Sequence, residues 1–302
     1  MRVSKNLTPC QGKMHRDELE INEATVKRLI AEQFPRFSYL PIRKVHSTGT
    51  VNAIFRLGEA YCVRLPRLAW ANESLHNEWK VLPVLLNNVT LTIPRVVGKG
   101  KPNAEYPLDW AIYGWIKGSP CGHSPISEME TASALARFIS ELRLIQTPED
   151  APKAGRKPLR ELDESTEKAI AACKGDVDVE KARGIWRVLL GTEPWNGKPV
   201  WIHADLLKPN LLVHGGRLSA VIDFGSAGVG DPAFDITPAW TVLTSETRER
   251  FKNMLCVDDC TWLRAKAYAL HQAALIIPYY RKSNPAFVDQ AKCTMDSILE
   301  DR

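Results

Sequence analysis

Hydrophobic positions in the first third of the chain change from a helical to a β-type pattern. Residues 20–34 carry apolar side chains at helical spacing, and Pro35 ends that pattern. Short β-type runs then follow at residues 42–47, 52–57 and 61–65. Gly58-Glu59-Ala60 joins the last two runs, which predicts a hairpin. A helix at residues 72–86 and strands at residues 91–97 and 110–116 complete this region, which we predict to be mostly sheet.

The pattern becomes mainly helical after Gly118-Ser119-Pro120. We predict helices at residues 126–145, 161–173 and 179–190, and helical patterns fill most of the chain from residue 226 to the end. Residues 147–159 are rich in proline, lysine and glycine and are typical of a surface loop. A compact strand-loop-strand block interrupts the helices at residues 199–225. The chain therefore divides into two lobes that join near residues 110–118.

Composition and charge narrow the class of protein. The chain has 302 residues, of which 44% are hydrophobic and 25% charged, as in ordinary globular proteins. The net charge of +5 is small and no long basic run exists, so we expect no nucleic-acid partner. The most apolar stretches, residues 81–86 and 267–280, are too short to span a membrane. Seven scattered cysteines without paired C-x-x-C spacing favour reduced thiols, and we expect a soluble cytoplasmic protein.

The segment of residues 200–235 carries the strongest chemical pattern. His203-Ala204-Asp205 leaves a β-type run, Asn210 follows five residues after Asp205, and Asp223-Phe224-Gly225 ends the next hairpin. This H-x-D-x-x-x-x-N and D-F-G order is typical of a phosphotransferase. Asp205 would orient an acceptor hydroxyl and take its proton, while Asn210 and Asp223 would hold Mg²⁺ against nucleotide phosphates. We expect His203 to support the loop by hydrogen bonds rather than to shuttle protons.

The first lobe offers residues for a matching nucleotide clamp. A candidate phosphate-covering loop lies between two predicted strands and contains Ser47, Thr48, Gly49, Thr50 and Asn52. Arg64, on the following strand, is placed to contact the α- and β-phosphates, and Glu78 on the next helix is its predicted ion-pair partner. Lys208, three residues after Asp205, could neutralise the transferring phosphoryl group or face solvent.

Taken together, these segments resemble the aminoglycoside phosphotransferase family, within the group that includes choline kinases and other small-molecule kinases. The resemblance rests on STGTVNAIFRLG, CVRLPR, Glu78, WAIYGWIKG, HADLLKPN and IDFGSAGVGDPAFD, and it spans both lobes. It implies an α+β, bilobal protein-kinase-like fold with a small antiparallel-sheet N-lobe and a larger, mostly helical C-lobe. It also implies ATP or GTP with Mg²⁺, purine binding by the backbone of Ala111 to Tyr113, and anchoring of the catalytic loop by Asp231 and Asp235.

The resemblance also sets the expected domain limits. We expect residues 14–113 to form the nucleotide-binding N-lobe and residues 114–302 to carry the catalytic loop and the acceptor site. Residues 1–13 are polar and aperiodic, which predicts a disordered segment or a leader. Ala204 stands where the family usually has glycine, a small change that we expect the loop to tolerate.

The acceptor is the open question. Only Ser226 to Gly230 separate Gly225 from Asp231, which is too short for the activation segment of a protein kinase and favours a small-molecule hydroxyl acceptor. Residues 226–302 hold ten acidic and nine basic residues, so they lend no special support to a polycationic substrate. We expect the acceptor to be an aminoglycoside-type or other antibiotic. A macrolide, a choline-like or sugar-like metabolite, and a non-catalytic nucleotide-binding protein stay open. We expect a monomer or homodimer without a membrane partner.

Overall fold

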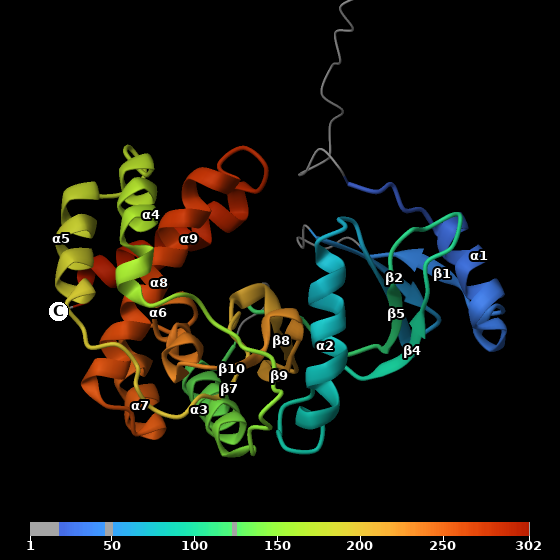
Figure 1. Cartoon of the computed structure of the whole chain (residues 1–302), viewed down its shortest axis with the longest axis horizontal. Coiled ribbons are helices and arrows are strands. Elements are labelled where there is room, and N and C mark those ends of the chain that lie inside the picture. Colours follow the sequence, from blue (N-terminus) through green and yellow to red (C-terminus); the bar gives the residue numbers. More distant parts are fainter. Residues whose placement is uncertain (1–17, 46–50, 123–125, 302) are drawn as a thin grey trace, which may run out of the picture. The chain divides into compact units, whose positions relative to one another are not determined.

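The computed structural model describes residues 18–45, 51–122 and 126–301. Our predictions for residues 1–13 and for Ser47, Thr48, Gly49 and Thr50 lie outside these ranges. The described chain forms two compact units (Figure 1). The first consists of the chain up to Asn72 together with Gly98–Ile112, and the second of Glu73–Val97 together with the chain from Tyr113 onward.

The described helices and strands follow the predicted order with a few changes of limits. The helices are α1 (Glu23–Gln33), α2 (Ala71–Leu85), α3 (Glu128–Leu144), α4 (Leu159–Ala172), α5 (Val179–Leu190), α6 (Pro238–Thr241), α7 (Ser245–Leu255), α8 (Asp259–Tyr280) and α9 (Pro285–Glu300). The strands are β1 (Ile42–Lys44), β2 (Asn52–Leu57), β3 (Tyr61–Pro66), β4 (Val96–Gly100), β5 (Trp110–Gly114), β6 (Ser119–Pro120), β7 (Val200–Ile202), β8 (Leu211–His214), β9 (Arg217–Val221) and β10 (Gly228–Gly230).

A five-stranded sheet with the order β1-β2-β3-β5-β4 dominates the first unit. The predicted hairpin of β2 and β3 is confirmed, with Phe55 opposite Val63 in an antiparallel register. Alternate residues of β2 are buried, as the period of a strand with one covered face requires. Helix α1 buries Val26, Leu29 and Ile30 on one face and ends before Pro35, as predicted.

One predicted strand lies in the wrong place. We expected residues 91–97 to form a strand, but β4 begins only at Val96. Pro94 cannot donate a backbone hydrogen bond, so it interrupts any ladder at this point. Thr92 instead forms an isolated parallel bridge with β9. Its N–H donates to Ser219 at 3.2 Å, and Val221 donates to its carbonyl at 3.0 Å.

Helices make up most of the second unit. The prediction of residues 126–145 and 179–190 as helices is confirmed by α3 and α5. Helix α8 is packed against α9, α4 and α5, and it buries residues on several sides (Figure 1). Within the described part of the chain, no helix has both the length and the apolar character that a membrane span needs. The small sheets β10-β7 and β6-β8-β9 carry the chemical segment of the sequence.

Candidate active site

Two short strand pairs bring the predicted catalytic residues together within the second unit. Strand β7 pairs with β10, and the chain leaves the sheet at His203. Strands β8 and β9 form a hairpin in which Leu211 lies opposite Val221. Ile222 N–H then donates to the carbonyl of Asn210 at 2.9 Å. The hairpin therefore places the residue after Ile222, Asp223, beside the end of the loop that begins at His203.

Asp205 and Asn210 are joined directly. The Nδ2 atom of Asn210 donates to the carboxylate Oδ2 of Asp205 and to its backbone carbonyl, both at 2.9 Å. These two bonds close the loop between the residues and fix the orientation of the Asn210 amide. The amide oxygen of Asn210 makes no hydrogen bond to any residue that the structure describes, so it is available to a ligand.

The charge of Asp223 reaches Asp205. Burial, and then the negative charge of Asp223, raise the pKa of Asp205 to about 6. The hydrogen bond from Asn210, the positive charge of Arg156 and a hydrogen bond from Gln272 act in the opposite direction. Two carboxylates that repel each other in a half-buried site are a natural place for a cation. The structure thus brings together all three residues of the predicted centre: Asp205, Asn210 and Asp223.

His203 supports the loop from inside the protein. Its ring is completely buried and packs edge-on against Phe224 at 4.5 Å between ring centroids. Its Nδ1 accepts from the N–H of Asp205 at 3.2 Å, so Nε2 carries the proton and donates to the carbonyl of Ile222 at 3.1 Å. Burial lowers the pKa of His203 to about 4, and the ring is therefore neutral. This arrangement agrees with the predicted supporting role.

Asp235 holds the start of the same loop. Its carboxylate accepts from the backbone N–H of His203 at 2.7 Å and from that of Ala204 at 2.8 Å. Ala204 has a φ of +63°, in the left-handed region where glycine is preferred. The two bonds to Asp235 secure this unusual turn. The expected anchoring of the loop by Asp235 is confirmed, and the glycine that the family usually has at this position is explained by the backbone.

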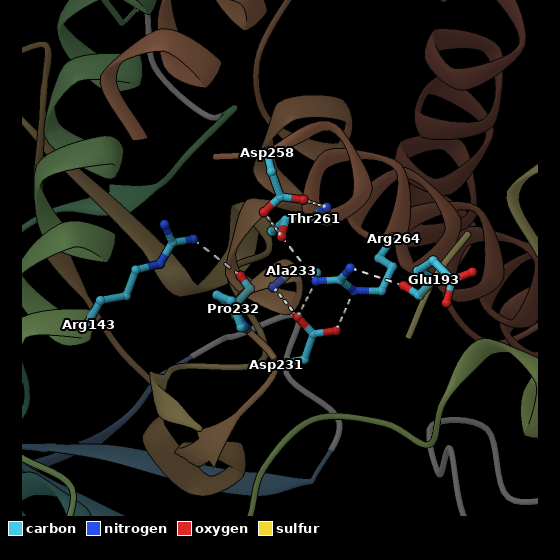
Figure 2. A network of polar contacts seen from close by, with 8 residues as sticks. All are labelled: Arg143, Glu193, Asp231, Pro232, Ala233, Asp258, Thr261 and Arg264. Atoms are coloured by element: carbon cyan, nitrogen blue, oxygen red, sulfur yellow. Dashed lines mark hydrogen bonds and ion pairs between the residues drawn. The ribbon is translucent and has the colours of Figure 1, made fainter. Parts of the chain in front are cut away.

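Asp231 has a different task, which Figure 2 shows. Its carboxylate accepts from Arg264 Nε at 2.8 Å and Nη2 at 3.2 Å, and also from the N–H of Ala233 at 2.9 Å. Arg264 donates further to the carbonyl of Glu193 at 3.2 Å and to Thr261 Oγ1 at 3.0 Å. The side chain of Arg264 is 4% exposed. Asp231 therefore ties the turn before Asp235 to helix α8, and in the described chain it makes no hydrogen bond to the loop itself.

Helix α2 fixes the Asp223-Phe224-Gly225 turn. The buried carboxylate of Glu78 accepts from Phe224 N–H at 3.1 Å and from the hydroxyl of Tyr113 at 2.5 Å. Asn77 Nδ2 donates to the carbonyl of Gly225 at 3.0 Å. A Cβ atom at Gly225 would lie 1.9 Å from Ser74 Oγ, so only glycine lets helix and turn approach this closely.

The remaining predicted residues are distributed over both units. Arg64 is buried on β3, and the Asn52 oxygen, when turned toward it, accepts from its Nη2 at 3.0 Å and Nε at 3.2 Å. Arg64 and Glu78 belong to different units, and their pairing stays a prediction. Ala111 and Tyr113 lie on β5, which has a strand neighbour on each side. The assignment of the backbone of Ala111 to Tyr113 to purine binding stays a prediction.

Lys208 lies in a short turn between the loop and β8. It lines a small, open pocket next to α8 and α9. The pocket also includes Leu207, whose N–H donates to the carbonyl of Asp205 at 2.9 Å, and Gln272. Motifs did not indicate Gln272 or Arg156, because both are far from the loop in sequence. The basic composition of residues 147–159 was the only signal for Arg156.

The donor set suits Mg²⁺ held together with nucleotide phosphates. Among the residues that the structure describes, no group of three or more His, Cys, Asp or Glu side chains could hold a metal ion. Mg²⁺ commonly binds through one or two protein oxygens and takes its other ligands from phosphates and water. The amide oxygen of Asn210 and the carboxylate of Asp223 match this pattern. These two residues would hold the ion.

Comparison with known proteins agrees with the geometry. Residues 43–270 match the model of the phosphotransferase enzyme family, and the chain belongs to this family. Aminoglycoside 3'-phosphotransferase from Escherichia coli is 25% identical over 158 residues, which are 51% of this chain and 58% of that protein. The match thus spans a little more than half the length of that relative.

Solved structures of similar fold cover nearly the whole chain. The GDP and kanamycin complex of APH(2")-IIia has a TM-score of 0.69 at 18% identity and covers 93% of this chain and 100% of its own. Macrolide 2'-phosphotransferase type I has a TM-score of 0.62 at 17% identity and covers 90% and 97%. At these identities the likeness shows the fold. The predicted α+β, bilobal protein-kinase-like fold is confirmed.

Proposed function

We propose that the protein is a phosphotransferase that moves the γ-phosphoryl group of ATP or GTP to a hydroxyl of a small molecule. The observation that carries this proposal is the joined set of Asp205, Asn210 and Asp223 on a loop that buried groups hold in place. An O-phosphotransferase needs a carboxylate beside the acceptor hydroxyl and oxygen ligands for Mg²⁺ close to it. Family membership supports the same chemistry.

In the proposed reaction, Asp205 is the base. Its carboxylate accepts the proton of the acceptor hydroxyl while the hydroxyl oxygen forms a bond to the γ-phosphorus. The bond from the γ-phosphorus to the bridging oxygen breaks, and the nucleoside diphosphate leaves with that electron pair. Magnesium held by Asn210 and Asp223 would offset the charge of the phosphates when bound. A carboxyl pKa of about 6 makes Asp205 a stronger base than an ordinary aspartate while leaving it mostly ionised at pH 7.

The nucleotide-binding part of the proposal rests on the first unit. Arg64 would contact the α- and β-phosphates, because its buried guanidinium is held beside Asn52 on the sheet. Ser47, Thr48, Gly49 and Thr50 remain the predicted phosphate-covering loop. The N-lobe of residues 14–113 and the C-lobe of residues 114–302 are proposed in this functional sense. A cytoplasmic location and a monomeric or homodimeric state also stay predictions.

Antibiotics are the first acceptors to test. The named relatives are phosphotransferases of aminoglycosides and of macrolides, and one was solved with kanamycin. A choline-like or sugar-like metabolite is the alternative acceptor. A nucleotide-binding protein without catalysis is disfavoured because Asp205, Asn210 and Asp223 are all present and lie together.

Nucleotide turnover by the purified protein tests the proposal. ATP and GTP are each supplied with Mg²⁺ and with aminoglycosides, macrolides, choline and simple sugars, and EDTA serves as the metal-free control. Asp205→Ala should abolish acceptor-dependent turnover, whereas Asp296→Ala, an exposed aspartate on α9, should leave it unchanged. Turnover that survives in Asp205→Ala would exclude Asp205 as the base. Nucleotide binding without transfer to any acceptor would favour the non-catalytic alternative.

A further inference from the structure

Among the described residues that line the pocket beside Asp205, none carries a carboxylate. Its lining residues are mostly apolar or small, with a few amide and hydroxyl groups: Leu207, Lys208, Thr241, Ala269, Gln272, Ala273, Ile276, Phe287, Gln290, Ala291 and Thr294. Lys208 is the only charged residue among them. It makes no ion pair or hydrogen bond with any residue that the structure describes. A polycationic ligand would therefore meet a like charge here and find no carboxylate on the wall to bind.

The helices that form the pocket carry acidic residues, but on other faces. Helix α9 presents Phe287, Gln290, Ala291 and Thr294 to the pocket, a spacing that defines one face of a helix. Asp289 lies two residues from Phe287 and from Ala291, and Asp296 lies two residues from Thr294. Both therefore project from the opposite, exposed face of the helix. Helix α8 presents Ala269, Gln272, Ala273 and Ile276 in the same way and has no acidic residue beyond Asp259.

A second cation lies near the same end of the pocket. Arg156 belongs to the loop before α4, and its charge acts both on Asp205 and on His271, the neighbour of Gln272 in α8. No hydrogen bond or ion pair ties Arg156 to another part of the described chain, and its side chain is exposed. A guanidinium whose charge reaches Asp205 can interact with an incoming ligand. The charge of Glu128 acts on Cys121, as does that of Lys208, and the Glu128 carboxylate accepts a hydrogen bond from Thr244 Oγ1 at 2.5 Å.

We propose that this pocket receives an acceptor that carries a carboxylate or another anionic group near its hydroxyl, on an apolar body, and that Lys208 binds the anion. The proposal rests on the proposed phosphotransferase function and specifies its substrate class. Lys208 then serves the acceptor rather than the transferring phosphoryl group. The apolar faces of α8 and α9 would cover the body of the ligand, while its hydroxyl points to Asp205.

Matched ligands that differ only in charge provide the test. Mandelate, mandelamide and 2-amino-1-phenylethanol share a hydroxyl and a phenyl group but are anionic, neutral and cationic in turn. Isothermal titration of the full-length protein with each, and with kanamycin, measures the preference directly. We expect mandelate to bind at least about tenfold more tightly than the amine, the usual size of one charge-assisted contact.

Variants of Lys208 link that preference to the pocket. Lys208→Met should bring the ratio of mandelate to amine affinity close to one, and Lys208→Arg should retain it. Lys168→Met, at an exposed site on α4, is the matched control and should change nothing. Tighter binding of the amine or of kanamycin, a preference that survives in Lys208→Met, or no binding of mandelate would overturn the proposal.

The proposed function can fail separately from this inference. If ATP and GTP are not consumed with any acceptor, while mandelate still binds with the expected dependence on Lys208, the pocket assignment holds and the phosphotransferase assignment fails. If kanamycin is phosphorylated in an Asp205-dependent way and mandelate does not bind, the reverse is true.

Discussion

The loop of residues 203–210 and the pocket next to it meet at Leu207 and Lys208, but their polar groups are arranged in opposite ways. Around the loop, buried groups satisfy one another: both ring nitrogens of His203 are bonded, and both oxygens of Asp235 accept backbone N–H groups. The described wall of the pocket is mostly apolar, and its single charge, on Lys208, has no hydrogen-bond or ion-pair partner in the described chain. The hydrogen bonds of the loop fix its geometry, whereas the unpaired cation of the pocket is free to bind the proposed ligand.

This contrast makes the loop the place for the largest effect on activity. Asp205→Asn keeps the shape of the side chain but removes the proposed base, so kcat should fall by about 10³-fold. Nucleotide affinity should change by less than about threefold, because the proposed metal ligands Asn210 and Asp223 remain. Steady-state kinetics and nucleotide titration measure the two quantities. A parallel loss of nucleotide affinity would show that Asp205 supports the site rather than the proton transfer.

The next prediction concerns the support behind the loop. Arg264→Met leaves the Asp231 carboxylate, 12% exposed, without its cation. Breaking a buried ion pair on one side should lower the free energy of unfolding by about 3 kcal/mol, measured by urea denaturation. Lys168→Met removes an exposed ion pair with Glu164 and should cost less than about 0.5 kcal/mol.

A double variant sharpens this result. Asp231→Asn combined with Arg264→Met removes both charges and should regain part of the lost stability, since no unpaired carboxylate remains. If the single and double variants are equally unstable, the packing of Arg264 against its neighbours, rather than its charge, stabilises this region.

A pH dependence is expected on the pocket side, at His271. Its ring is buried, with Nδ1 at 2.7 Å from Thr166 Oγ1, and burial together with the charge of Arg156 lowers its pKa from 6.5 to about 4. Below pH 6.5 His271 is protonated in the unfolded chain but stays neutral in the folded protein. The free energy of unfolding therefore decreases as the pH falls from 6.5 toward 4. Between pH 7 and pH 5 this loss is about 2 kcal/mol.

Comparison with a variant isolates this contribution. His271→Gln cannot titrate, so the difference in unfolding free energy between wild type and variant should shrink by about 2 kcal/mol from pH 7 to pH 5. His203 has a similarly lowered pKa and titrates in both proteins, so it cancels in the comparison. A difference that stays constant with pH would mean that His271 is already accessible to protons in the folded state.

The same contrast explains what the sequence could predict. The meeting of Asp205, Asn210 and Asp223 at one site was predictable because they lie within one short segment whose strands and turns fix their spacing. The hairpin of β2 and β3 was predictable for the same local reason. The strand expected at residues 91–97 was wrong because Thr92 pairs with β9, far away in the chain, and Pro94 stops the local ladder. The pattern of hydrophobic residues at 91–97 shows neither this pairing nor the effect of the proline.

The pocket was not predictable, since α8, α9 and the turn at Lys208 come together only in the folded chain. Sequence composition reported ten acidic and nine basic residues after Gly225, an almost neutral balance. The structure shows that the acidic and the pocket-lining residues of α9 lie on different faces of the helix, which the overall charge balance does not reveal. Gln272 and Arg156 likewise act on Asp205 only because the folded chain brings them near it. The sequence predicts Glu78 as the ion-pair partner of Arg64, but it carries no signal for the contacts of Glu78 with Phe224 and Tyr113.

The smallest expected effect lies at the turn that aims Asp205. Ala204 has a φ of +63°, where a Cβ atom costs about 1–2 kcal/mol, whereas glycine has no such penalty. Ala204→Gly also gives the unfolded chain more freedom, which costs about 0.4–1 kcal/mol. The relief of strain is the larger effect, so the variant should be more stable by about 0.5–1 kcal/mol in urea denaturation.

The control is an alanine with ordinary helical backbone. Ala267→Gly in α8 relieves no strain and should destabilise the protein by about 1 kcal/mol. Opposite signs for the two alanine-to-glycine changes would establish that the protein stores strain at the catalytic turn, with the two bonds to Asp235 holding it there. Equal losses in both variants would mean that Ala204 is relaxed, and that Asp235 stabilises an unstrained loop.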